Sequence, residues 1–161
     1  MPDAQQLRQR LIRNFHDAPR ERFVRAPHYD TEGASLSAGT AATQLGARLD
    51  VVAPGQQSCP YHYHHGEEEM FVILQGEGTL RVAGERLPLK AGDTIFIPAG
   101  PEYPHQILNT STAPLHYLSI STQKSPEICV YPDSGKVGCY APGLRLLQRQ
   151  DAGVDYWAGE A

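Results

Sequence analysis

The sequence predicts a single all-β domain with one short N-terminal helix, built as an antiparallel sandwich or closed barrel. From about Thr40 to Ser121, short alternating or apolar runs follow one another, and turn-forming Gly and Pro residues separate them. No run with helical periodicity interrupts this series. At 161 residues, the chain can bury about two-thirds of the surface that its unfolded form exposes, so one core is expected.

Residues 1–39 are predicted to form a helix followed by an extended arm. Asp3 is the expected N-cap, with Gln6 three residues further on, and Pro19 ends the segment. One helix is too little for a helix-turn-helix DNA reader, so we expect it to pack on the barrel or on a partner subunit. The helix should run from Ala4 to about Asp17, with apolar residues at helical spacing at Leu7, Leu11, Ile12 and Phe15.

Residues 40–121 are predicted to form the barrel core. Each expected strand is bounded by a cluster of turn residues, such as Lys90-Ala91-Gly92-Asp93. The expected strands are Leu45–Ala53, Met70–Leu74, Thr79–Val82, Thr94–Ile97, Gln106–Leu108 and Leu115–Ile120.

Residues 122–161 are predicted to form a C-terminal hairpin and a tail, packed on the barrel or on a partner subunit. The stretch Glu127–Tyr140 contains two strands around Pro132-Asp133-Ser134-Gly135, a four-residue loop in which Pro fixes one φ angle. The hairpin can extend the sheet of its own chain or exchange with a neighbouring subunit. Both alternatives stay open at the level of sequence.

Composition argues against two classes of partner. The 14 Lys and Arg residues against 18 Asp and Glu residues give a mildly acidic chain without a basic face, so no nucleic acid is expected. The apolar runs are far shorter than the roughly 20 residues of a membrane-spanning helix, so no membrane association is expected.

The start of the chain lacks the layout of a signal peptide, and three cysteines without a C-x-x-C pair are expected to be free thiols. A cytoplasmic protein is predicted.

Two histidines and a carboxylate have the spacing of a metal site. His62 and His64 stand at positions i and i+2, so on a strand both imidazoles lie on the same face. Glu69 follows after a potential turn, which can bring its carboxylate to the same point. Imidazole and carboxylate donors suit one divalent transition metal ion (Fe, Mn, Ni, Co, Cu or Zn) and argue against a thiolate-bound structural zinc.

Around these residues, the sequence closely resembles the two motifs of the cupin family. The first is Pro54-Gly55, six residues, His62-Tyr63-His64, four residues, Glu69, six residues and Gly76, with one residue more than usual before His62. The second is Gly92, five residues, Pro98-Ala99-Gly100, then His105, three residues and Asn109, with four residues before His105 where two are more usual. The resemblance implies a double-stranded β-helix, or jelly-roll, barrel whose metal ligands are His62, His64, Glu69 and His105.

Strand alternation predicts which side chains face the interior. If Glu69 points inward, Phe71, Ile73 and Gln75 do as well, while Met70, Val72 and Leu74 form an outward apolar strip against another layer or subunit. A register slip of one residue would exchange Glu68 for Glu69, and the spacing to Gly76 favours Glu69. The same alternation turns Ile107 and Asn109 inward with His105. Asn109 either supports the site or holds a turn.

The leading functional hypothesis is a metal-dependent enzyme that acts on a small polar metabolite. Isomerase or epimerase chemistry on a sugar or sugar phosphate and dioxygenase chemistry both remain open, because cupins perform all of these. A sugar phosphate would need cations, for which Arg48, Arg81 and Lys90 are candidates. The alternative is a small-molecule binding or sensory cupin without turnover, since no general base is evident beyond the ligands. A homodimer is expected from the apolar strip and the terminal segments.

Overall fold

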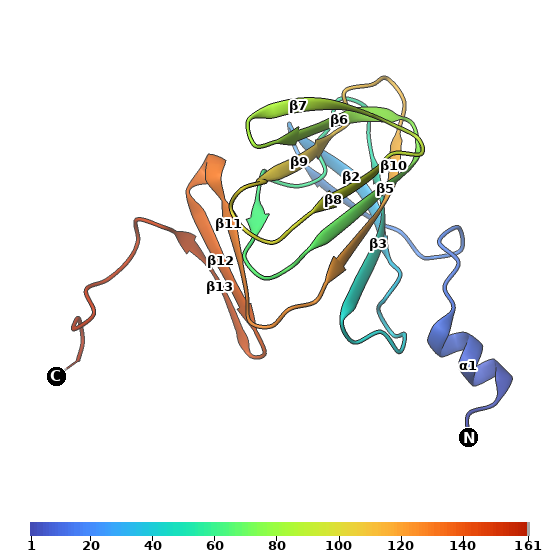
Figure 1. Cartoon of the computed structure of the whole chain (residues 1–161), viewed down its shortest axis with the longest axis horizontal. Coiled ribbons are helices and arrows are strands. Elements are labelled where there is room, and N and C mark those ends of the chain that lie inside the picture. The colour runs from blue at the N-terminus through green and yellow to red at the C-terminus, as the bar shows by residue number, and fades with distance from the viewer. Residues whose placement is uncertain (161) are drawn as a thin grey trace.

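A computed structural model describes residues 1–160 and contains one antiparallel jelly-roll domain (Figure 1). Two of its sheets enclose the core, which consists of apolar side chains from β3 and from β5 to β10. The larger sheet has six strands in the order β1 (Glu21–Arg25), β2 (Tyr29–Ser35), β3 (Leu45–Val52), β10 (Leu115–Thr122), β5 (Glu69–Gln75) and β8 (Thr94–Ile97). The smaller sheet has the order β7 (Glu85–Lys90), β6 (Glu77–Val82) and β9 (His105–Leu108). The predicted fold class and all six predicted barrel strands are therefore confirmed.

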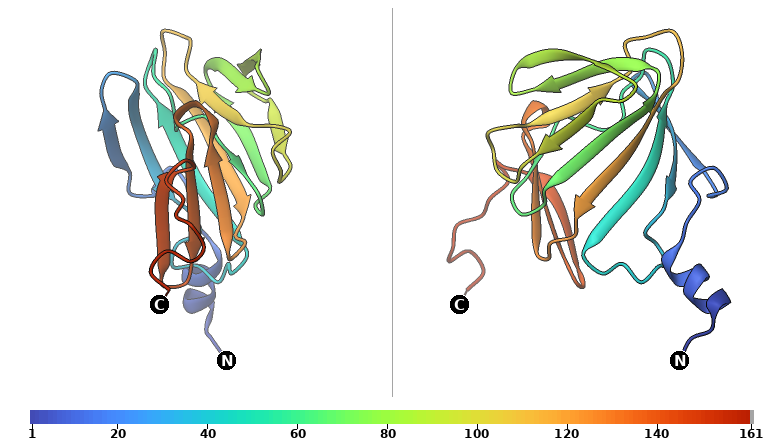
Figure 2. Two further views of the ribbon diagram at one scale, coloured as in Figure 1. Left: turned by 90° about the vertical axis from the view of Figure 1, so that its left-hand side faces the viewer. Right: turned by 45° about the vertical axis from the view of Figure 1, so that its right-hand side comes forward.

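A third sheet closes one side of the barrel. Its order is β13 (Leu144–Arg149), β12 (Lys136–Ala141), β11 (Glu127–Tyr131) and β4 (Tyr63–His64). The predicted hairpin is present, with the 3₁₀ turn η1 (Pro132–Ser134) and Gly135 at a φ of 60° between its strands. Strand β11 pairs with β4 of its own chain, so this sheet connects the C-terminal segment to the barrel next to the first two predicted ligands (Figure 2).

The N-terminal segment differs from the prediction in two respects. Helix α1 (Ala4–Leu11) has the expected capping box between Asp3 and Gln6, but it ends at Leu11 because Ile12 has an extended backbone. None of its residues is buried, so the prediction that it packs on the barrel is wrong for its own chain, and the helix projects from the body (Figures 1 and 2). The predicted extended arm contains the hairpin β1–β2, which lengthens the six-stranded sheet.

Alternation along β5 agrees with the prediction except at its end. Glu69, Phe71 and Ile73 are buried, as predicted. The inward prediction for Gln75 is wrong, because Gln75 is exposed and the pairing with β10 shifts register between His116 and Tyr117. A β-bulge of this kind turns the residues beyond it away from the regular alternation. The predicted outward residues of β5 are partly buried, so they form no exposed apolar strip.

Asn109 holds a turn, which decides between the two roles left open by the sequence. Its side chain is 1% exposed, and its amide group donates hydrogen bonds of 2.8 Å to the backbone carbonyls of Val52 and Ala113. Its Oδ1 accepts hydrogen bonds from the amide and hydroxyl groups of Ser111. Its side chain therefore holds the loop between β9 and β10 and connects it to the end of β3.

The described residues 1–160 include no helix that is long and apolar enough to cross a membrane. Cys59, Cys129 and Cys139 are free thiols, as predicted. Cys129 is buried, and the other two are partly buried.

Candidate metal centre

The four predicted metal ligands come together inside the barrel around the carboxylate of Glu69. Glu69 Oε2 lies 2.9 Å from His105 Nε2, 3.7 Å from His64 Nε2 and 3.9 Å from His62 Nε2. Glu69 is the first residue of β5, His105 is the first residue of β9, and His64 lies on β4. An isolated bridge pairs His62 with His105, and its two backbone hydrogen bonds fix the first and fourth predicted ligands beside each other.

These distances suit donors around one ion. Ligands about 2.0–2.2 Å from a metal lie roughly 3 Å apart when adjacent and roughly 4.2 Å apart when opposite. The three distances from Glu69 Oε2 fall in this range. Glu69 Oε2 and His105 Nε2 are both buried and have no hydrogen-bond partner in the described residues, although they approach each other to 2.9 Å. Buried polar atoms without partners are costly, and an ion between them would satisfy both.

Each histidine also has a partner for its other ring nitrogen. Nδ1 of His62 lies 2.8 Å from the carbonyl of Pro60, and Nδ1 of His105 lies 3.2 Å from the carbonyl of Tyr103. Nδ1 of His64 lies 3.2 Å from Oε1 of Glu127. Such contacts fix ring orientation in metal sites. All three rings therefore keep Nε2 available toward Glu69.

The electrostatics of Glu69 favour the ionised carboxylate. Burial alone would raise the pKa of this carboxyl, but contacts with His105, His64 and His62 outweigh burial and hold the pKa below its ordinary value. A carboxylate that is ionised and surrounded by imidazoles is a ready ligand for a divalent cation.

One face of β11 supports the centre from outside the predicted motifs. Alternation places Glu127, Cys129 and Tyr131 on this face. Besides facing His64, Glu127 accepts hydrogen bonds from the backbone amides of His65 and Gly66, and the Tyr131 ring stacks on His62 with centroids 6.1 Å apart. The sequence pointed to a hairpin here but not to its pairing with β4, so these roles were missed.

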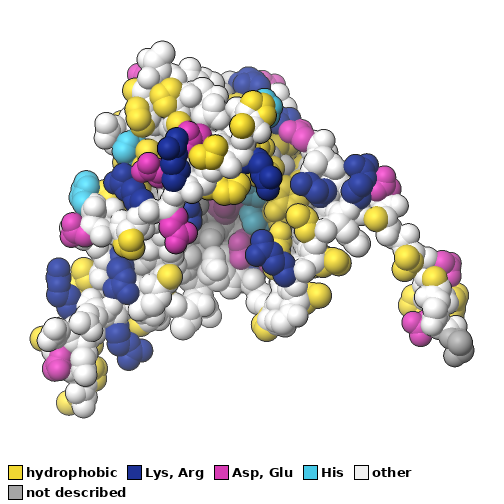
Figure 3. All heavy atoms as spheres, turned by 180° about the vertical axis from the view of Figure 1, so that it is seen from behind, with side chains coloured by type: hydrophobic (Ala, Val, Ile, Leu, Met, Phe, Trp, Pro, Cys, Tyr) yellow, Lys and Arg dark blue, Asp and Glu magenta, His cyan; other side chains and the backbone are white. Residues whose placement is uncertain are grey.

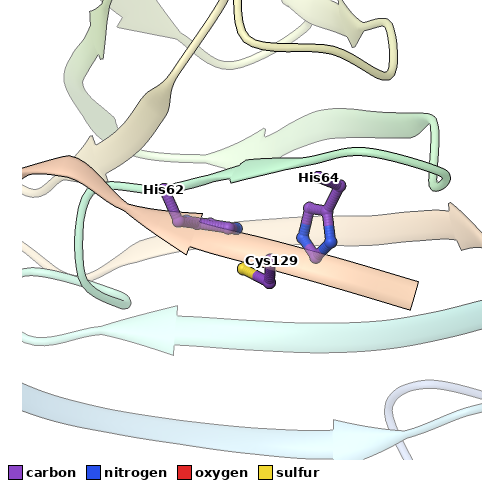
Figure 4. A group of neighbouring side chains, drawn as sticks. All are labelled: His62, His64 and Cys129. Atoms are coloured by element: carbon purple, nitrogen blue, oxygen red, sulfur yellow. The ribbon is translucent and has the colours of Figure 1, made fainter. Parts of the chain in front are cut away.

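Cys129 lies beside the two histidines of the first motif. The ligand atoms of His62, His64 and Cys129 all lie within 4.8 Å of one another (Figure 4). The same holds for the ligand atoms of His62, Glu69 and His105. Burial raises the pKa of the Cys129 thiol to about 11. The two groups share His62, so Cys129 lies next to the candidate centre.

The centre opens onto a pocket of about 350 Å³ that contains a second carboxylate. Asp50 on β3 lines this pocket together with His62, Glu69 and His105. Burial raises the pKa of Asp50, and a 2.7 Å hydrogen bond from Arg48 Nε opposes part of this effect. Asp50 was missed in the sequence, although its position two residues after Arg48 on a strand places both on one face.

A larger cleft of about 1070 Å³ adjoins this pocket, and both are lined by Phe23, Ser58 and Cys59. Four cationic side chains line the cleft. Arg81 is paired with Asp133 at 2.6 and 2.8 Å, whereas the other three have no carboxylate within ion-pair distance among residues 1–160. Seen from behind, basic side chains are grouped around a hollowed part of the surface (Figure 3). The three cations without a carboxylate partner are Arg25, Arg86 and Lys136.

The remaining candidates from the sequence have other positions. His65 and Glu68 are exposed, which supports Glu69 as the inward carboxylate. Of the three candidate phosphate cations, Arg48 lines the pocket and Arg81 lines the cleft. Lys90 lines neither, and it is exposed at the end of β7.

Comparisons with known proteins agree with this fold. Residues 48–121 match the family described as Cupin domain. An oxalate-binding protein of Thermotoga maritima is 39% identical over 77 residues, which are 48% of this chain and 60% of that protein. The chain belongs to the cupin superfamily. Auxin-binding protein 1 of Arabidopsis thaliana is 31% identical over 134 residues, which cover 76% of this cupin and 64% of that protein.

Among solved structures, this cupin is similar to a protein of Acidithiobacillus ferrooxidans that has a provisional sugar phosphate isomerase assignment. The TM-score is 0.78 with 25% identity, and the alignment covers 96% of this chain and 95% of the other. In contrast, this cupin spans less than two-thirds of the length of the two curated relatives above.

Proposed function

We propose that this cupin holds one divalent transition metal ion through His62, His64, Glu69 and His105, and that it isomerises or epimerises a small sugar or sugar phosphate. The observation that carries the proposal is the carboxylate of Asp50, which lines the same small pocket as three of the four donors. The pocket thus combines a cation site with a proton acceptor. Both are needed to move a proton next to a carbonyl group.

The metal ion contributes one kind of chemistry when bound: it polarises an oxygen atom of the ligand as a Lewis acid. Fe, Mn, Ni, Co, Cu and Zn all accept imidazole and carboxylate ligands. The protein contributes the fixed positions of the four donors and a largely buried pocket, in which electrostatic interactions are stronger than in water.

Asp50 is the proposed general base. Aldose–ketose isomerisation and epimerisation both begin with removal of a proton from a carbon beside a carbonyl. A carboxylate with a raised pKa accepts such a proton more readily than an ordinary one at neutral pH. Arg48 donates a hydrogen bond to Asp50 Oδ1 and fixes the orientation of the carboxylate.

The adjoining cleft supports a phosphorylated substrate. Arg25, Arg86 and Lys136 give it three cations without carboxylate partners, in a chain whose net charge is −4. Arginine and lysine are the usual protein partners of phosphate. Hydroxyl groups of Thr31, Ser58 and Ser119 line the smaller pocket, where they can bind the hydroxyl groups of a sugar.

The test is proton exchange in heavy water. Protein loaded with each candidate metal is incubated with a panel of aldoses, ketoses and their phosphates, and deuterium at the carbon beside the carbonyl is measured by NMR. We expect exchange and interconversion that depend on the metal. Metal-dependent oxygen consumption without exchange would replace the isomerase by the predicted dioxygenase.

The second candidate function is small-molecule binding without turnover. Its support is that both curated relatives reported above are named as binding proteins, one for oxalate and one for auxin. Saturable binding of a panel compound by calorimetry, together with no exchange and no oxygen consumption, would favour this candidate over the enzyme.

We also keep the homodimer and the cytoplasmic location as proposals. Apolar side chains are exposed on two edge strands, β1 of the six-stranded sheet and β13 of the four-stranded sheet, which supports pairing with a second copy. They are Phe23 and Val24 on β1, and Leu144, Leu146 and Leu147 on β13. A monomer in solution scattering at micromolar concentration would contradict the homodimer. The three free thiols are typical of a reducing compartment.

A further inference from the structure

Strand β11 brings a sulfur atom to the metal centre. Its antiparallel pairing with β4 places Cys129 directly opposite His64. Opposite residues in such a pair have Cβ atoms about 4.5–5.5 Å apart on the same face of the sheet. Cys129 is 2% exposed, and the side chains of His62, His64 and Cys129 are grouped between the strands (Figure 4).

From this geometry, we propose that Cys129 is a further protein ligand of the metal ion. Its sulfur and one ring nitrogen each of His62 and His64 all lie within 4.8 Å of one another, a grouping that could hold a metal ion. The inference rests on the metal centre of the proposed function and adds a donor that lies outside the two sequence motifs.

The other two cysteines do not meet the same conditions. Cys59 Sγ lies 3.8 Å from His62, but it faces Nδ1, the nitrogen that is turned toward the carbonyl of Pro60. Cys139 belongs to neither group of potential ligands in the described part of the chain. Cys59 and Cys139 therefore serve as matched controls for substitution of a thiol.

A thiolate changes which ions the centre prefers. Nitrogen and oxygen donors alone accommodate Mn²⁺ and Fe²⁺, whereas a sulfur ligand favours Zn²⁺, Co²⁺ and copper. A centre with His62, His64 and Cys129 in its ligand set should therefore discriminate against Mn²⁺ more strongly than a centre of three imidazoles and one carboxylate.

X-ray absorption of the zinc-loaded wild-type protein tests the inference without any substitution. We expect a sulfur scatterer at about 2.3 Å from zinc, in addition to nitrogen and oxygen at about 2.0–2.2 Å. Zinc stoichiometry is measured on the same sample. Bound zinc without sulfur would overturn the Cys129 ligand and leave the four-ligand centre standing, whereas no bound zinc would overturn both.

Substitution then identifies the sulfur. In the Co²⁺-loaded protein, thiolate-to-cobalt charge-transfer absorption should be present in the wild type, absent in Cys129→Ser, and unchanged in Cys59→Ser and Cys139→Ser. The affinity of Cys129→Ser for zinc should fall by about tenfold or more. Charge-transfer absorption that survives in Cys129→Ser would contradict the assignment.

Discussion

The barrel strands and strand β11 contribute to the metal centre in different ways. Strands β4, β5 and β9 carry predicted ligands at or near their first residues, close to the turns that precede the strands. Pairing between segments of the barrel brings these ligands together. Strand β11 contributes residues that lie about sixty positions from the first motif, and it reaches the centre through only two paired residues of β4. The difference separates the ligands predicted from the sequence from residues that orient them or, as proposed for Cys129, add a ligand.

This comparison teaches that the centre extends beyond the matched family region. Residues 48–121 contain all four predicted ligands and Asp50, whereas Glu127, Cys129 and Tyr131 lie outside it. Changes in the barrel should therefore affect chemistry or the presence of metal. Changes in β11 should affect how tightly and with what geometry the metal is held.

The largest effect is expected from Asp50→Asn on the barrel side. Loss of a general base typically lowers the rate by about 10²- to 10⁴-fold. Since Asp50 is not one of the proposed ligands, metal content should remain at the wild-type level. Turnover is measured as kcat/KM with the substrate found by proton exchange. Asp30→Asn serves as the control, because Asp30 is partly buried and paired with Arg22 but lines neither pocket. Equal loss in both variants would contradict the role of Asp50.

The pH dependence of the wild type follows from the same residue. Burial raises the pKa of Asp50, so the carboxylate form disappears at a higher pH than for an ordinary aspartate. As pH falls, kcat/KM should therefore decline, and the midpoint of this decline should lie above the ordinary pKa of an aspartate. A limb at the ordinary aspartate value, with metal still bound, would show that a different group is titrating.

On the β11 side, Glu127→Gln should weaken metal binding by about 10- to 100-fold without abolishing it, because the amide is a poorer acceptor for His64 Nδ1. Zinc affinity by chelator competition measures this. Glu67→Gln is a matched control, since its carboxylate lies 3.8 Å from the same nitrogen instead of 3.2 Å. If Glu67→Gln had the larger effect, Glu127 would not be the residue that orients His64.

Tyr131→Leu should have a smaller effect on the same affinity. The ring stacks on His62, and aromatic pairs contribute about 0.5–1.5 kcal/mol, which corresponds to roughly a 2- to 10-fold change in affinity. Tyr131→Phe keeps the stacking and should bind zinc like the wild type. Equal losses in the two variants would assign the effect to the hydroxyl group instead of the ring.

The smallest effect concerns the cleft, where barrel and C-terminal sheet each supply a cation. Arg86→Ala and Lys136→Ala should each raise KM for a phosphorylated substrate by about 2- to 5-fold, since exposed ion pairs contribute about 0.2–1 kcal/mol. KM for the unphosphorylated sugar should not change. A parallel increase for both substrates would indicate that the cleft does not recognise phosphate.

Sequence reasoning recovered what depends on local spacing. The i, i+2 histidines, the turn before Glu69 and the Gly and Pro clusters are features of short segments, so the barrel strands and the four converging side chains could be predicted. The inward prediction for Gln75 was wrong because the β-bulge near it depends on the partner strand β10. The predicted end of α1 at about Asp17 was wrong. The helix ends at Leu11, and none of its residues is buried against the rest of the chain. Glu127 was missed because its role depends on pairing between distant strands.

The most direct test of the centre is metal analysis of the wild type and His64→Ala, both purified without chelators or metal-affinity columns. Elemental analysis should find close to one divalent transition metal ion per wild-type chain and only a trace in the variant, because a ligand at the junction of barrel and β11 is lost. Circular dichroism confirms that both proteins are folded. The same trace amount of metal in both proteins would contradict the metal centre.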